Sequence, residues 1–172
     1  DRDPTSIQYR VIAEIRKRGP RVIFDDDDRG ESADVVAIWE KTDTLEIEFW
    51  HCKYAMDVTP GKRIKELYEL CGQAQKCIHW MQKPPDLFTH LMRREPRRLL
   101  GRSATRYEVG AVSDLMRLRE KAGSQRLLLR VNIVQPGLSK AECSRDQLQL
   151  LAVTEDFLLG TREIPLGIVA SD

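Results

Sequence analysis

Nine consecutive residues, LEIEFWHCK, alternate between two sets of side chains, and they are the strongest constraint on how this chain can fold. Successive side chains of a β-strand point to opposite faces of a sheet. The alternation therefore predicts a strand with one face made by Leu45, Ile47, Phe49, His51 and Lys53. The imidazole and the amine that end this apolar face are candidates for a chemical site, and a core histidine followed by a solvated lysine is the alternative.

The rest of the chain reads as strands and helices separated by turn residues. Strands are predicted over residues 21–25, 33–39, 45–53, 107–112, 126–135 and 164–171, and helices over residues 6–18, 60–82, 113–121 and 144–160. An arginine-rich stretch, residues 86–105, is expected to be irregular, with a helical turn around residues 87–94 as a further expectation. Three consecutive strands followed by alternating helices and strands predict an α/β fold, with a mixed central β-sheet flanked by helices.

Length and composition favour one domain. The 172 residues, 41% of them hydrophobic, are enough for a single core, so residues 1–172 are expected to form one domain. The chain begins with Asp1 rather than Met, and we expect it to be a piece of a longer protein. Four scattered cysteines with no CxxC pair are typical of reduced thiols, and no apolar run approaches the roughly 20 residues of a membrane span. A cytoplasmic location is the expectation.

Charge is segregated along the chain although the formal net charge is only +1. Residues 25–57 carry eleven acidic and three basic side chains, whereas residues 93–106 carry six arginines and one glutamate. Such a separation suits a site that gathers cations beside a surface that gathers phosphates. A solvated acidic hairpin and a basic loop remain the alternative. The arginines expected to contact nucleic acid are Arg93, Arg94, Arg97, Arg98 and Arg102.

Two polar residues fall on the apolar faces of predicted helices. Glu14 lies on the stripe formed by Ile7 and Val11, and Gln75 lies within about 20° of Ile64 on a helical wheel. A carboxylate or amide that faces inward needs a partner, so both are candidates for a polar site. Glu14 at the rim of its stripe, paired with a neighbouring arginine, is the alternative.

The acids and bases near the third strand suit phosphodiester hydrolysis. That reaction needs a divalent ion to neutralise phosphoryl oxygens and acidify water, and a cation near the developing charge. Asp34, His51, the Cys52 carbonyl and Glu14 are predicted to hold the ion, and Lys53 to assist the attacking water.

These residues resemble the PD-(D/E)XK nucleases, the restriction-endonuclease-like superfamily. The resemblance covers about residues 5–82, with Asp34 as the first acid and His51-Cys52-Lys53 as the (D/E)xK tripeptide. It implies an αβββαβ core with additional C-terminal α/β elements, an acid from the first helix at Glu14, and a catalytic glutamine at Gln75.

The tripeptide departs from the family pattern because His51 replaces an acid. Imidazole supplies no negative charge and is a softer ligand, so the affinity for Mg²⁺ should fall and Mn²⁺ should gain. Glu31 or Glu14 would restore the missing charge. A site that has lost activity, in a fold kept for binding, is the other interpretation.

The predicted function is a metal-dependent DNA endonuclease that uses Mg²⁺ or Mn²⁺, the nuclease domain of a bacterial DNA-processing or phage-defence protein. The expected partners are DNA and a helicase or ATPase module, with a homo-oligomer possible and no membrane. The alternative is a catalytically impaired nuclease-fold module that binds nucleic acid or a partner subunit.

Overall fold

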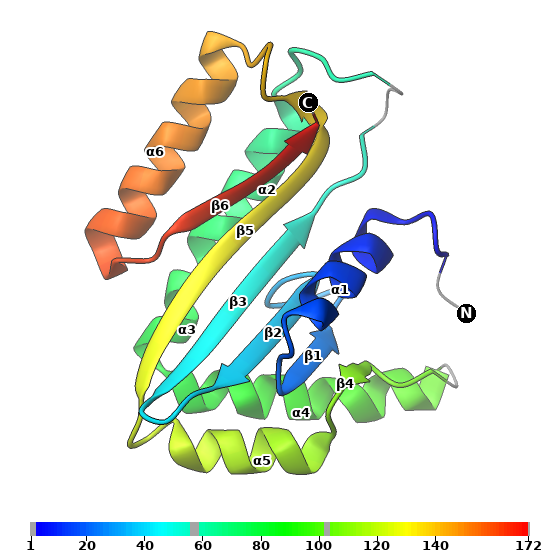
Figure 1. The fold of residues 1–172 in the computed structure, drawn as a ribbon, viewed down its shortest axis with the longest axis vertical. Helices are drawn as coiled ribbons and strands as arrows, with labels where there is room; N and C mark the ends of the chain where they lie inside the picture. Colours follow the sequence, from blue (N-terminus) through cyan, green and yellow to red (C-terminus); the bar gives the residue numbers. More distant parts are fainter. Residues whose placement is uncertain (1–2, 56–58, 102–103, 172) are drawn as a thin grey trace.

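A six-stranded mixed sheet forms the centre of the computed structural model, which describes residues 3–55, 59–101 and 104–171 (Figure 1). The strands are β1 (Val22–Asp25), β2 (Val35–Glu40), β3 (Thr44–Cys52), β4 (Tyr107–Val109), β5 (Arg126–Ser139) and β6 (Leu166–Ser171). The helices are α1 (Ile7–Lys17), α2 (Lys65–Lys76), α3 (Ile78–Gln82), α4 (Pro84–Gly101), α5 (Val112–Lys121) and α6 (Arg145–Arg162). The predicted α/β class with a mixed, helix-flanked sheet is confirmed at this level.

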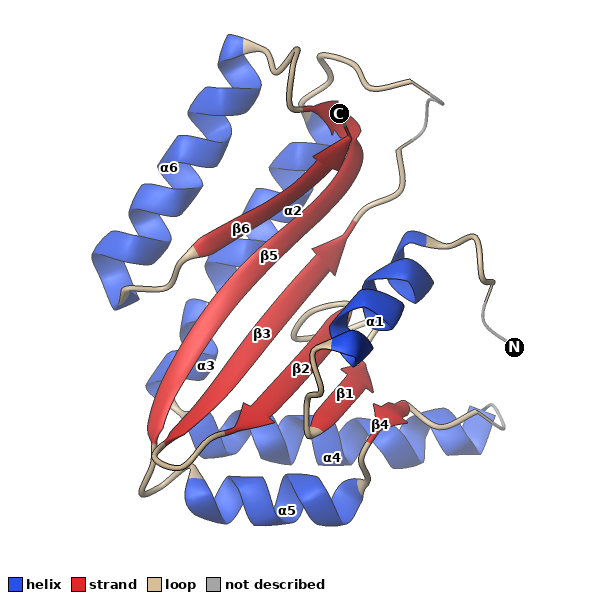
Figure 2. Ribbon diagram, viewed as in Figure 1, coloured by secondary structure: helices blue, strands red, loops and turns tan. Residues whose placement is uncertain are grey.

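The strand order is β4-β1-β2-β3-β5-β6. The first three strands form an antiparallel meander, and β5 and β6 add to β3 in parallel, so the arrows of β3, β5 and β6 point the same way and that of β2 the opposite way (Figure 2). The register pairs Val35 with Trp50 and places the start of β2 beside the end of β3. Asp34 and His51 therefore come from adjacent strand ends.

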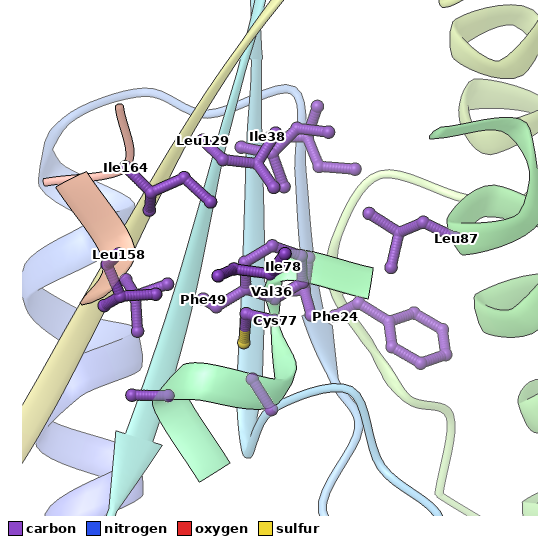
Figure 3. Close-up of a cluster of buried hydrophobic side chains, with 14 of the residues drawn as sticks. Phe24, Val36, Ile38, Phe49, Cys77, Ile78, Leu87, Leu129, Leu158 and Ile164 are labelled. Carbon is purple, nitrogen blue, oxygen red and sulfur yellow. The ribbon is translucent and has the colours of Figure 1, made fainter. Parts of the chain in front are cut away.

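The alternation predicted for β3 is confirmed. Leu45, Ile47 and Phe49 belong to the larger core cluster, which the sheet shares with the helices on one face. Side chains from α3, α4, α6 and four strands, β1, β2, β3 and β5, meet there around Phe49 and Ile78 (Figure 3). On the other face, α1 packs through Val11, Ile12 and Ile15 against a smaller cluster on β1 and β2.

Two predictions for the helices are wrong. The helix predicted over residues 60–82 is divided at Cys77 into α2 and α3. The arginine-rich segment expected to be irregular forms the 18-residue α4, with Pro96 inside it. Its apolar side chains Leu87 and Leu91 are buried, because α4 packs against the core and α5. Helical periodicity here outweighs the local signals for a loop.

None of the helices in the described ranges is long and apolar enough to cross a membrane.

Candidate metal centre

Three carboxylates meet where β1, β2 and their connecting loop come together. Oxygen atoms of Asp27, Glu31 and Asp34 all lie within 4.8 Å of one another. All three lie in the acidic loop, by which we mean the turn segment from Asp26 to Asp34, and Asp34 is the last residue before β2. Three hard oxygen donors at this separation are a donor set that suits Mg²⁺ or Mn²⁺.

The acidic loop is fixed by two buried arginines. Arg94 of α4 donates to the carbonyl oxygens of Asp26, Asp28 and Arg29, at 2.5, 3.2 and 2.9 Å. Arg106 donates to the carbonyl oxygens of Asp25 and Asp27, at 3.1 and 3.3 Å. Five consecutive carbonyls therefore point toward two guanidinium groups, whose planar forks supply several fixed donors each.

The Asp26 side chain anchors the same loop from within. Its carboxylate is fully buried, forms an ion pair with Arg94, and accepts hydrogen bonds from the Ser32 N–H and hydroxyl at 2.7 and 2.8 Å. Gly30 supplies the turn with a φ of 81°, a conformation that residues with a Cβ rarely adopt. The loop is thus held from both ends before any ligand arrives.

Burial and like charge shape the acidity of Asp34. Burial is the main cause that raises the pKa of Asp34 to about 7, and the negative charges of Glu31 and Asp27 raise it further. The Cys52 backbone N–H opposes this by donating to Asp34 Oδ2 at 2.7 Å. Burial also raises the pKa of Glu31. A cation would relieve the repulsion among these carboxylates.

Glutamines from two helices reach this loop. Gln73 Nε2 of α2 lies 3.4 Å from Glu31 Oε1, and Gln8 Nε2 of α1 donates to Asp25 Oδ1 at 2.9 Å. Gln75, the predicted catalytic glutamine, instead points to α6, where it meets Thr154 Oγ1 at 3.3 Å. Residues two apart on a helix lie on different faces, so the glutamine at the site is Gln73.

Glu14 does not join the cluster, and the prediction that it is a ligand is wrong. Its carboxylate is exposed on α1 and accepts a hydrogen bond from Lys17 at 2.6 Å. The inward face of α1 is made by Val11, Ile12 and Ile15, so Glu14 lies on the far side of the stripe.

His51 is a core histidine that borders the site. It lines a pocket of about 600 Å³ together with Asp27, Glu31, Gln73 and Lys76, but it is outside the carboxylate group. Its Nε2 lies 3.2 Å from Cys77 Sγ, and its Nδ1 has no hydrogen-bond partner among the described residues. Burial lowers the pKa of His51 to about 4, so the ring is neutral near pH 7.

Lys53 and Cys52 meet the site from the end of β3. Lys53 Nζ lies 2.5 Å from Glu69 Oε2 of α2, and this contact, more than the nearby charge of Asp34, raises the pKa of Lys53. Cys52 contributes the N–H that orients Asp34, and its carbonyl as a ligand stays a prediction. Burial raises the pKa of the Cys52 thiol, which packs against the smaller core cluster.

The arginines predicted to contact nucleic acid differ in burial and in how much of each the structure describes. Arg94 is buried, and its guanidinium donates hydrogen bonds to backbone carbonyls of the acidic loop, so the prediction that it contacts nucleic acid is wrong. Arg93 is exposed and lines a second pocket with Trp80 and His90. The side chains of Arg97 and Arg98, and the whole of Arg102, lie outside the described residues.

The residues missed from the sequence are those whose partners are distant in the chain. Asp27, Gln73, Lys76 and Arg106 carry no local motif, and only the acidic character of residues 25–28 marked the loop.

No family model matches this chain, and neither the curated proteins nor the solved structures contain a match to it.

Proposed function

We propose that the chain is a metal-dependent DNA endonuclease with a restriction-endonuclease-like core. The order of its elements supports this: α1, the β1–β3 meander and α2 precede β5, which lies parallel to β3. In this proposal α3, α4, β4 and α5 are additions between α2 and β5, and α6 and β6 extend the core. The proposal assigns the tripeptide 51–53 to the end of β3, next to Asp34.

The observation that carries the proposal is the group of three carboxylates. Asp27, Glu31 and Asp34 would hold one or two divalent ions, with the Cys52 carbonyl as a further candidate ligand. A bound Mg²⁺ or Mn²⁺ supplies charge neutralisation at the phosphoryl oxygens and acidifies a water. Glu31 provides a negative charge that His51 cannot, which is the compensation expected for the altered tripeptide.

The remaining roles fall to neighbouring side chains. Lys53 assists the attacking water or the developing charge, and Glu69 sets the position of its ammonium group. Gln73 orients Glu31. Arg93 binds the backbone of DNA, and the same role is proposed for Arg97, Arg98 and Arg102.

A cleavage assay that compares carboxylate-to-amide variants at the site with a matched variant outside it tests the proposal. Supercoiled plasmid, linear duplex and single-stranded DNA are incubated with the chain in Mg²⁺, in Mn²⁺ and in EDTA. Cleavage should require the metal and should fall at least about 100-fold in Asp34→Asn and Glu31→Gln, since a group that stabilises the transition state typically contributes this much. Glu14→Gln, a change of the same kind at the exposed ion pair with Lys17, should cleave normally.

A binding module that does not cut is the second candidate. It is favoured by His51, which is neutral and buried where the nuclease pattern has an acid, and by the ion pair that engages Lys53. This candidate predicts DNA affinity that falls with salt, without EDTA-sensitive loss of DNA. Metal-dependent cleavage that disappears in Asp34→Asn excludes it.

The wider context is also proposed. We propose a helicase or ATPase module, in a bacterial DNA-processing or phage-defence system of the cytoplasm, as the partner. Association into a homo-oligomer is a further proposal that sedimentation of the purified chain tests.

A further inference from the structure

Two pockets meet at Trp80. The first, of about 600 Å³, is lined by residues 27–32 of the acidic loop and by His51 and Lys76. The second, of about 410 Å³, lies along the first half of α4 and is lined by Thr89, His90 and Arg93. Trp80, half-buried on α3, lines both. A ligand that occupies both pockets would contact this indole.

The two pockets differ in charge. In the lining of the first pocket three acids, Asp27, Asp28 and Glu31, outnumber the two bases, Arg29 and Lys76. The second pocket offers the exposed guanidinium of Arg93, the Thr89 hydroxyl and the His90 imidazole, with Asp86 as its acid. Arg94 also borders it but is bound to Asp26. A metal-bound phosphate in the first pocket and a neighbouring phosphate at Arg93 would fit this division.

Trp80 stands between two histidine rings. The His79 ring meets it edge-on, with centroids 5.1 Å apart and planes at 68°, and the His90 ring is tilted by 44° at 5.0 Å. Histidine, tryptophan and arginine in one groove are the usual platform for unpaired bases, because each base has a π-face that an aromatic ring can cover. In an intact duplex those faces are covered by neighbouring base pairs.

We propose that Trp80 stacks an unpaired base and that the substrate is single-stranded DNA, or a single-stranded segment of a junction, laid from the acidic loop to Arg93. This inference rests on the proposed function, which it deepens by naming the form of the substrate. The aromatic rings would select a strand with exposed bases, and Arg93 would hold its backbone without reading sequence.

Binding measurements on the full chain test this inference separately from cleavage. Fluorescence anisotropy of a labelled 12-nucleotide DNA strand, its duplex and the same strand as RNA is recorded in EDTA over a range of salt. Trp80→Leu keeps apolar volume but removes the π-face, and should weaken single-strand binding about 5- to 150-fold, the range for loss of one stacked base. Trp50→Leu, the same change on the strand face opposite to His51, should bind as wild type.

Arg93 provides a second variant that does not depend on packing. Arg93→Gln should weaken binding and reduce the slope of log K against log salt by about 0.7, the value for one phosphate contact on a single strand. Arg119→Gln, an exposed arginine of α5, is its control. Thermal melting checks that Trp80→Leu and Trp50→Leu stay folded.

The outcomes separate this inference from the proposed nuclease. One outcome overturns the inference and leaves the proposed nuclease standing. In it, cleavage depends on metal, duplex and single strand bind with equal affinity, and these affinities are unchanged in Trp80→Leu and Arg93→Gln. Single-strand binding that depends on Trp80, without cleavage in any metal, supports the inference and overturns the nuclease. A tenfold or greater preference for the RNA strand overturns the assignment to DNA.

Discussion

The guanidinium of Arg94 and the carboxylate of Asp26 form an ion pair in which both side chains are almost completely buried, at 5% and 0% exposed. The pair joins α4 to the acidic loop across 68 residues of sequence. It sets the path of the loop, and the loop sets the separation of Asp27 and Glu31. A buried arginine that is not itself a proposed ligand therefore decides the geometry of the site.

Removing Arg94 should be costly. Arg94→Met leaves the Asp26 charge buried without its counter-charge, and we expect the free energy of unfolding to fall by about 3–5 kcal/mol. Arg93→Met, the same change at the exposed neighbour, should alter it by about 0.5 kcal/mol or less. Urea denaturation of both variants measures the difference. Adding Asp26→Asn to Arg94→Met should recover part of the loss, and equal stability of the two arginine variants would contradict this account.

Asp34 and His51 should give opposite pH dependences in the metal-free chain. The pKa of Asp34 is raised to about 7 in the folded state, so its contribution to stability is present below about pH 4 and is lost as the pH rises to about 7. The pKa of His51 is lowered to about 4, so its contribution is present above about pH 6.5 and is lost as the pH falls to about 4. Between about pH 4 and pH 6.5 the two groups therefore change the free energy of unfolding in opposite directions.

Single variants should reveal the pH dependence that each of these two groups contributes. Between pH 4.5 and 6.5, the free energy of unfolding of Asp34→Asn should rise with pH relative to that of wild type. Over the same range, the free energy of unfolding of His51→Leu should fall with pH relative to that of wild type. Each difference is on the order of 1 kcal/mol per pH unit, the value for one proton. Urea unfolding in EDTA at several pH values gives these slopes, and parallel curves for all three proteins would rule out the two pKa values.

The sequence predicts those parts of the fold that depend on periodicity. Leu45, Ile47 and Phe49 define β3 because a buried face repeats every second residue, whatever the partner strand is. In α4 the same kind of signal was present, since Leu87, Leu91 and Arg94 follow at helical spacing, but Pro96 and the arginines obscured it. Long-range packing stabilises this helix, and local propensity does not reveal such packing.

The candidate site was predicted less completely for a different reason. Asp34 was found because its neighbours form a strand pattern, and Glu31 because an acid was needed nearby. Asp27 could not be distinguished from Asp28, since the choice depends on which carbonyls Arg94 and Arg106 bind. Gln73 could not be distinguished from Gln75, since the choice depends on which face of α2 meets the acidic loop and which meets α6. The prediction for Glu14 was wrong because helical-wheel arithmetic placed it on the stripe of Ile7 and Val11, whereas the buried face of α1 is made by Val11, Ile12 and Ile15.

Two lysines compete for the role beside the attacking water. Lys53 is ion-paired with Glu69, whereas Lys76 lines the pocket with Glu31 and His51. Because the charge of Asp34 acts on Lys53, we expect Lys53→Met to lower the cleavage rate at least about 100-fold and Lys76→Met to lower it less than about tenfold. Single-turnover rates at saturating DNA measure both. The reverse order would transfer the role to Lys76.

Divalent ions should stabilise the chain through the three carboxylates. At a Mn²⁺ concentration of about 100 times its dissociation constant, binding adds about 2.7 kcal/mol, which raises the Tm of a chain of this size by about 5 to 10 °C. Glu31→Gln should abolish this shift and should itself raise the Tm in EDTA, because it removes one of three charges that repel each other. Glu14→Gln should keep the full shift. Differential scanning calorimetry with and without Mn²⁺ gives these values, and an undiminished shift in Glu31→Gln would place the ion elsewhere in the molecule.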